Sequence, residues 1–186
     1  MLDSPDTIAR SRLRSGEQLL WAGRPDPSRL FNASDVFLIP FGLFFTGFSI
    51  FWTVSASRSP APFVALFGIV FVAVGVYYVF GRFVVKRSRL ARSTYAVTNR
   101  RAFAVIGRTL IETPVGAQRT ITASGDDHVT VLWSDRPGIR SLTRNQVPAN
   151  SGLDGILSPL PMGFFGVPES AALLAALDRA ETATLT

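Results

Sequence analysis

The sequence lacks several of the residues on which site chemistry depends. Among 186 residues there is no cysteine and only one histidine, and 18 of the 19 basic residues are arginine. Without cysteine the chain has no disulfide framework, no thiolate metal site and no cysteine nucleophile, which fits a reducing compartment. The glycines do not recur in the G-x-G-x-x-G or P-loop patterns. The sequence therefore gives no positive case for an enzyme, and we expect no catalytic residues and no cofactor.

The single histidine, His128, follows Asp126 and Asp127. A metal site needs further donors at ligand spacing, and the neighbouring sequence does not supply them. A Ser-His-Asp arrangement would have to use this same histidine, and no strand-turn-helix nucleophile motif accompanies it. We interpret His128 as a surface residue beside a turn and expect no metal site.

Charge is absent from two long stretches, residues 36–54 and 61–80, which are rich in Phe, Val, Leu and Ile. A bilayer core about 30 Å thick is crossed by roughly 20 apolar helical residues. A buried helical pair in a soluble core is the alternative, but neither stretch offers a polar face to water. A cleaved signal peptide is also not expected. The 35 residues before the first stretch are too many for the start of an ordinary signal peptide, and a second apolar stretch follows the first. The pattern predicts a two-helix transmembrane hairpin over residues 36–80.

Basic residues are concentrated on one side of this hairpin. The formal net charge is +6. The segment after the second stretch, residues 81–92, is a basic juxtamembrane linker, whereas the loop at 55–60 carries only Arg58. By the positive-inside rule we expect a multi-pass membrane protein with both termini cytoplasmic, in which residues 1–35 form a cytoplasmic segment. Nucleic acid is not expected as a partner, because the sequence shows no platform of aromatic and basic residues.

Small residues recur along both stretches at helical spacing. On the first they are Gly42, Thr46, Ser49 and Thr53, and on the second Ala61, Ala65, Gly68, Val72 and Gly75. Small side chains let two helix backbones approach closely in lipid. We expect these two faces to pack together and the phenylalanines of the first stretch to point mostly outward. A polar pathway is the alternative, but neither stretch contains an ionisable residue.

After the linker the pattern changes to β-strands. β-Rich runs at 94–98 and 101–106 are separated by Asn99-Arg100, which indicates a tight hairpin. Further strands are expected at 109–115, 118–123, 128–134 and 163–167, and a helix at 168–180 with Leu173, Leu174 and Leu177 on its core face. Residues 135–160 are rich in Pro, Gly, Asn and Ser and are interpreted as a long connection. Residues 1–14 are expected to be poorly ordered.

Two motifs flank the hairpin. The first, Gly-Glu-x-x-Leu-Trp-x-Gly-Arg-Pro, comprises Gly16, Glu17, Leu20, Trp21, Gly23, Arg24 and Pro25. The second, Tyr-x-Val-Thr-Asn-Arg-Arg, comprises Tyr95, Val97, Thr98, Asn99, Arg100 and Arg101. In this order, with the two apolar stretches between them, they resemble bacterial membrane proteins that carry a pleckstrin-homology-like (PH-like, bPH2-type) domain.

The resemblance implies a membrane α+β protein. Its transmembrane hairpin would be followed, over residues 93–183, by a PH-like antiparallel β-barrel or bent sheet of seven strands, capped by a C-terminal helix. It also implies a role in membrane-associated assembly or stress-related scaffolding and no catalytic residues. The region 135–160 departs from the compact spacing of such domains and leaves the sixth strand unassigned.

Six basic residues are candidates for contacts with lipid headgroups or a partner: Arg82, Lys86, Arg87, Arg89, Arg100 and Arg101. The plain alternatives are that the first four only set the topology and that the last two stay solvated or pair with acidic neighbours. We expect a membrane-embedded, non-enzymatic protein that uses a sheet edge or helix-capped groove to bind a protein partner or itself. An anionic-lipid-sensing module is the second hypothesis, and a transport or channel subunit the third.

Overall fold

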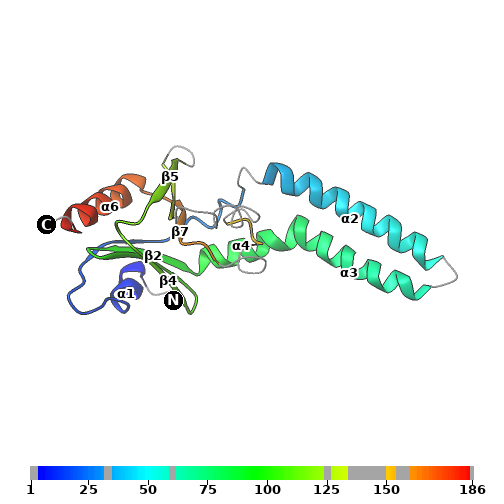
Figure 1. Cartoon of the computed structure of the whole chain (residues 1–186), viewed down its shortest axis with the longest axis horizontal. Helices are drawn as coiled ribbons and strands as arrows, with labels where there is room; N and C mark the ends of the chain where they lie inside the picture. The colour runs from blue at the N-terminus through cyan, green and yellow to red at the C-terminus, as the bar shows by residue number, and fades with distance from the viewer. Residues whose placement is uncertain are drawn as a thin grey trace.

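The computed structural model describes residues 4–31, 35–58, 62–123, 127–133, 150–153 and 160–184. The chain is a mixed α+β protein in which two long helices project away from a compact β-rich part (Figure 1). Helices α1 and α6, near the two ends of the chain, both lie with the sheets, far from the tip of the helical hairpin (Figure 1).

The first long helix is α2, Asp35–Ser57. After the short 3-10 turn η1, Pro62–Val64, helix α3 covers Ala65–Val76, the π-wound turn η2 covers Tyr77–Gly81, and α4 covers Arg82–Ala91. These last three elements form one helix, Ala65–Ala91, of 27 residues. By length and composition, this helix and α2 are each sufficient to cross a membrane. The basic linker of the sequence prediction is therefore helical and continues the second apolar stretch.

The two helices contact each other through their small residues, as predicted. A side-chain carbon added to Gly75 would lie 3.0 Å from Cα of Thr46, and one added to Gly68 would lie 3.2 Å from Cα of Thr53. The hydroxyls of Thr46 and Thr53 donate to carbonyls one turn earlier in their own helix, each at 2.6 Å. Those hydrogen bonds satisfy the polar groups within the helix, so the contact needs no water.

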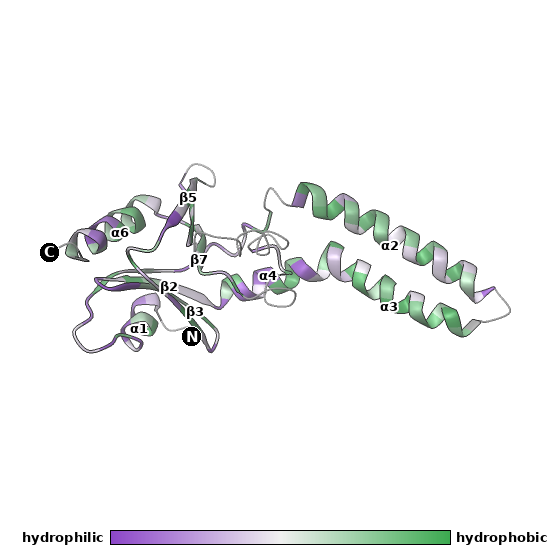
Figure 2. Cartoon of the chain, viewed as in Figure 1, coloured by the Kyte–Doolittle hydropathy of each residue, from purple (hydrophilic) through white to green (hydrophobic). Residues whose placement is uncertain are grey.

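The opposite faces of both helices carry large apolar side chains that no part of the described chain covers. Phe37 and Phe44 are 79% and 75% exposed, and the hydrophobic colour of Figure 2 is concentrated on α2 and α3. Phe45 differs from the other phenylalanines of α2 because it is half-buried, with its ring centroid 6.2 Å from that of Phe71. The outward orientation predicted for the phenylalanines of α2 holds for Phe37, Phe41, Phe44 and Phe48.

The β-rich part contains two antiparallel sheets. The first has the order β1-β2-β3-β4, formed by Leu19–Gly23, Ser93–Thr98, Arg101–Ile106 and Thr109–Pro114. The second has the order β5-β6-β7, formed by Arg119–Ala123, Val129–Trp133 and Gly163–Val167. Each predicted strand is present within a residue or two of its expected bounds. The segment around Trp21, which precedes the helices in sequence, is an edge strand of the first sheet.

A single apolar core joins the sheets to the C-terminal helix α6, Ser170–Thr184. The ring of Phe164 stacks on Tyr95 with centroids 4.6 Å apart and meets Trp133 edge-on at 4.9 Å. Leu173 and Leu177 of α6 are fully buried in this core, as their spacing predicted. The helix begins later than expected because Glu169 has a φ of 58°, a left-handed conformation that cannot be part of a right-handed helix.

The expected disorder near the N-terminus is wrong for the residues that the structure describes. Pro5–Arg10 forms the helix α1, and the hydroxyl of Ser4 caps it by accepting from Thr7 N at 3.2 Å. Ala9 is completely buried against the outer face of the first sheet, in a cluster that includes Phe103. The Ser-Pro-Asp start of this segment is a regular helix start signal.

Candidate functional site

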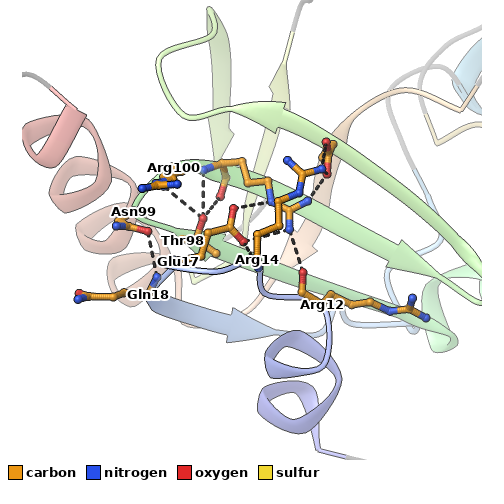
Figure 3. Close-up of polar contacts among 9 residues, drawn as sticks. Arg12, Arg14, Glu17, Gln18, Thr98, Asn99 and Arg100 are labelled. Carbon is orange, nitrogen blue, oxygen red and sulfur yellow. Dashed lines mark hydrogen bonds and ion pairs between the residues drawn. The ribbon is translucent and has the colours of Figure 1, made fainter.

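The two motifs meet in the first sheet. At the turn between β2 and β3, the Thr98 hydroxyl accepts from Arg100 N at 3.2 Å and Arg101 N at 3.0 Å, and donates to Arg101 O at 2.9 Å (Figure 3). Asn99 Oδ1 accepts from Gln18 N at 3.0 Å, and Asn99 N donates to Gln18 O at 3.2 Å. The turn residues therefore shape the hairpin and join it to the segment that precedes β1.

Arg101 is the centre of this network. Its Nε and Nη2 donate to the two carboxylate oxygens of Glu17 at 2.8 and 3.0 Å, its Nη2 also donates to Arg12 O at 2.8 Å, and its Nη1 pairs with Glu112 (Figure 3). The Glu17 side chain is only 2% exposed. The hydrogen bonds from Arg101 hold the pKa of Glu17 below its ordinary value of 4.5, against the opposing effect of burial. Arg14 joins the network by pairing with Glu112 at 2.7 Å.

The apolar residues of the first motif also have structural positions. Trp21 lies 6.2 Å from Phe164 between ring centroids, and Leu20 packs against the same core. A side chain at Gly23 would collide with the Trp21 ring, and Pro25 is buried. Because β1 pairs directly with β2, both motifs belong to one packed unit. The two motifs are therefore in contact in the folded chain, although the two long helices separate them in the sequence.

A second polar cluster lies where the helices meet the sheets, and we call it the junction. Asp35, the first residue of α2, pairs with Arg82, the first residue of α4, and both side chains are almost fully buried. Arg82 Nε also donates to Tyr78 O at 2.7 Å, and its guanidinium carbon lies 4.3 Å from the ring centroid of Phe83. Lys86, one turn further along, donates to the carbonyl of Leu30.

Residues 150–153, which lie between β6 and β7 in the sequence, pack over this junction. Arg82 Nη1 donates to Ser151 O at 3.3 Å, and the Tyr77 hydroxyl donates to Gly152 O at 2.7 Å. Gly152 has a φ of +84°, and a side-chain carbon there would lie 2.8 Å from Cβ of Arg82. Only glycine fits both the conformation and the contact. The described part of the connection predicted at 135–160 is therefore buried on the helix.

The six basic candidates do not share one surface. Arg82, Lys86 and Arg101 are buried in the contacts just described, so they are not available to a headgroup or to a partner. Arg100 is exposed but lies in the β2–β3 turn, at the end of the sheet away from α4. Arg87 is exposed and Arg89 half-buried on α4. Contacts of Arg87 and Arg89 with lipid or a partner stay predictions.

His128 does not stand on an open surface. Its Nε2 lies 3.4 Å from Oδ2 of Asp26, a residue of the segment between β1 and the helices. The hydroxyl and amide of Ser28 hold the pKa of Asp26 below its ordinary value. Asp126, the expected neighbour of His128, lies outside the described residues. Within the described ranges, no group of three or more His, Cys, Asp or Glu side chains is placed to hold a metal ion.

The chain matches no protein-family model, and neither the curated proteins nor the solved structures gave a significant match.

Proposed function

We propose that this chain is a non-enzymatic integral membrane protein that holds a PH-like domain at the cytoplasmic face of the inner membrane, for protein interaction or membrane-associated assembly. One observation carries the proposal. The second apolar helix continues without a break from Ala65 to Ala91, and only Arg92 separates it from strand β2. The domain is thus an extension of the helix rather than a body on a flexible tether.

The distribution of exposed side chains supports the membrane part of this proposal. The uncovered phenylalanines of α2 and the valines of α3 would cost free energy in water, at about 25 cal/mol for each Å² of apolar surface. In hydrocarbon this cost disappears. The ion pair of Asp35 and Arg82 lies at the base of both helices, where charged groups reach the interface. The arginines that follow it indicate a cytoplasmic location for this end.

The junction supports a fixed orientation of the domain. The pair of Asp35 with Arg82 joins the bases of the two helices, and the hydrogen bond from Tyr77 to Gly152 joins the second helix to the β-rich part. The turn between β3 and β4 adds a third attachment, because Gly107 N donates to Arg92 O at 3.2 Å. A domain held in this way presents the same surfaces at the same height above a membrane, which suits a docking platform.

The partner-binding mode that we propose is strand addition at β5. This strand is at the edge of the second sheet, and Thr120, Ile121, Thr122 and Ala123 are all exposed. An exposed edge offers unpaired backbone donors and acceptors to an extended segment of another chain. The two antiparallel sheets and the C-terminal helix agree in general form with a PH-like domain.

Topology can be tested directly because the chain has no native cysteine. We would place single cysteines at Ser57, at the end of α2, and at Ala175, on an exposed face of α6, and treat intact cells with a membrane-impermeant maleimide. The proposal expects labelling of S57C in intact cells and of A175C only after permeabilisation. Labelling of A175C in intact cells, or recovery of the full chain in the aqueous fraction without detergent, would overturn it.

Partner binding is tested separately with a photo-crosslinking residue at Thr122, compared with one at Thr7 on the exposed side of α1. We expect a discrete adduct, either with another protein or with a second copy, from Thr122 and not from Thr7. Equal crosslinking at both positions, or none at either, would reject β5 as the binding edge while leaving the topology unaffected.

A further inference from the structure

Helix α4 has an inverted polarity where it begins. In its first two turns the buried side chains are the charged ones, Arg82 and Lys86, whereas the apolar Val84 is 69% exposed. Val84 lies about 160° around the helix from both of them, at about 100° for each residue. In the last turn the usual order returns, because the apolar Leu90 is buried. A helix in water buries its apolar face and exposes its polar one, so the start of α4 has the arrangement expected in apolar surroundings.

Three apolar residues at this level form a surface that we call the collar: Phe31, Phe83 and Val84. The ring of Phe31 is 5.2 Å from that of Phe83 between centroids, and Phe31 is 74% exposed. Phe83 and Val84 follow Arg82 directly in the helix, and Arg82 forms the buried ion pair with Asp35. The collar therefore lies just beyond this pair, on the side of the β-rich part.

We propose that the collar is a lipid-contact surface, and that the boundary between hydrocarbon and headgroups in the cytoplasmic leaflet lies between Val84 and Arg87. The inference rests on the proposed membrane insertion and deepens it by fixing the depth at which the β-rich part begins. The ion pair of Asp35 and Arg82 is then on the hydrocarbon side of the boundary. Its burial within the protein keeps both charges away from the acyl chains.

The length of the second helix supports this boundary. From Ala65 to Gly81, the residue before Arg82, a helix rises about 25 Å at about 1.5 Å for each residue. The hydrocarbon core of a bilayer is about 30 Å thick. Continuing the apolar span to Val84 brings its length to about 30 Å. The span therefore matches the thickness of the core when it includes the start of α4.

The placement of exposed charges agrees with this length. Among the described residues from Asp35 to Lys86, Arg58 at the tip of the hairpin is the one exposed charged residue, because Asp35, Arg82 and Lys86 are buried. Arg87 is the first exposed charge after the second span. A long arginine side chain at the end of an apolar span extends toward the headgroups and keeps its stem in contact with apolar surface.

A soluble protein partner fits the collar less well than lipid. The collar is continuous with the uncovered apolar side chains of the two helices, because Val36, next to Asp35, is 70% exposed and Phe80, one turn before Val84, is 67% exposed. A soluble partner bound to the collar would leave those side chains uncovered. Lipid covers the collar and the two helices in the same way, without a second binding partner.

The test uses spin labels at single cysteines in the full-length chain, which has no native cysteine, in nanodiscs of phosphatidylcholine and phosphatidylglycerol. The test variants are Val84→Cys and Phe31→Cys. The matched control is Ala91→Cys, an exposed position on the same face of α4 as Val84 and about 10 Å further along the helix. Phe67→Cys, at an exposed position on α3, reports on membrane insertion itself. Thermal unfolding of each variant checks that the β-rich part is intact.

The measurement compares relaxation of each label by molecular oxygen, which concentrates in hydrocarbon, with relaxation by a water-soluble nickel chelate. We expect oxygen to have the larger effect at positions 84, 31 and 67, and the nickel chelate to have the larger effect at position 91. A larger nickel effect in V84C or F31C would overturn the collar as a lipid contact. Protection of V84C from both reagents would overturn it by showing that protein covers the collar.

The remaining outcomes separate the boundary from the topology. A larger oxygen effect in A91C would overturn the boundary at Arg87, because the hydrocarbon would then extend to the end of α4. A larger nickel effect in F67C would reject membrane insertion and with it the proposed function. A larger oxygen effect in F67C together with a larger nickel effect in V84C would reject the collar alone.

Discussion

The guanidinium of Arg101 donates two hydrogen bonds to the carboxylate of Glu17, which lies 84 residues earlier in the chain and on the other side of both long helices in sequence. The pair therefore joins a residue that precedes the helical hairpin in the sequence to a residue that follows it. Its two residues belong to the two motifs that flank the hairpin in the sequence. The contact gives those motifs a physical task, which is to attach the N-terminal strand to the rest of the first sheet.

Replacing Glu17 by Gln should destabilise the β-rich part by about 3 kcal/mol, because removal of one partner leaves the other charge buried with reduced compensation. Urea unfolding followed by the fluorescence of Trp21 and Trp133 measures the change. Glu112→Gln is the control, since that side chain is 37% exposed and should contribute less than about 1 kcal/mol. Equal losses in the two variants would contradict the central position given to Glu17.

Stability should also fall in acid in a way that depends on Glu17. Hydrogen bonds from Arg101 lower the pKa of Glu17 in the folded state relative to its ordinary value of 4.5. A lowered pKa means that the unfolded chain takes up the proton first as the pH drops. The stabilisation is therefore complete above about pH 4.5 and is lost as the pH falls through the folded-state pKa.

Glu112 contributes in the same direction. Burial opposes its ionisation, but hydrogen bonds from Arg14 and the charge of Arg101 outweigh burial and leave its pKa lowered.

Unfolding midpoints measured between pH 7 and pH 3 should decrease less steeply in E17Q than in the parent chain. Parallel curves for the two proteins would show that Glu17 titrates alike in the folded and unfolded states.

The junction predicts a pattern across three variants. Asp35→Asn or Arg82→Gln alone should cost about 3–5 kcal/mol, because each leaves one uncompensated charge in a buried position. The double change to Leu at both positions should recover much of that loss, since an apolar pair of similar size needs no partner. Thermal unfolding in detergent micelles distinguishes the cases. If the double variant is as unstable as the sum of the single ones, the charges are not coupled.

The contact between α2 and α3 is testable with two glycines that differ only in their surroundings. A larger side chain at Gly75 would collide with Thr46, whereas a side chain at Gly47 would meet nothing within 4 Å. Gly75→Val should therefore destabilise the hairpin by about 1–3 kcal/mol through overpacking, and Gly47→Val should not. Resistance to unfolding by increasing SDS reports the difference. Loss of resistance in G47V alone would contradict the helix contact face that contains Gly75.

The long helices and the strands were predictable because each has a strong local signal. Uninterrupted Phe and Val define the long helices, and the small residues at Gly68 and Gly75 identify the face by which they contact. Alternating and β-branched residues define the strands. Long-range pairing of polar groups has no such signal, so nothing in the sequence near Arg101 indicates Glu17 as its partner.

The structure of the basic segment after the second apolar stretch was only partly predictable from the sequence. If the segment is interpreted as an irregular linker, nothing distinguishes the basic residues that are buried from those that are exposed. Interpreted as a helix, the spacing of Arg82, Lys86 and Leu90 places them on one face, as the structure does, and places Arg87 on another. The helical periodicity was present in the sequence. The burial of Asp35 and its pairing with Arg82 could not be predicted, because the pair joins residues 47 positions apart in the sequence.

The π-wound turn Tyr77–Gly81 sets the angular relation between the two halves of the long helix. A turn of this kind accommodates one more residue than an α-turn, and one residue corresponds to about 100° of rotation around an α-helix. Deleting a single residue here would rotate Arg82 and Lys86 away from Asp35 and Leu30 while leaving the contact of Gly75 with Thr46 in place. The orientation of the β-rich part relative to α2 and α3 therefore depends on one extra backbone residue in this turn.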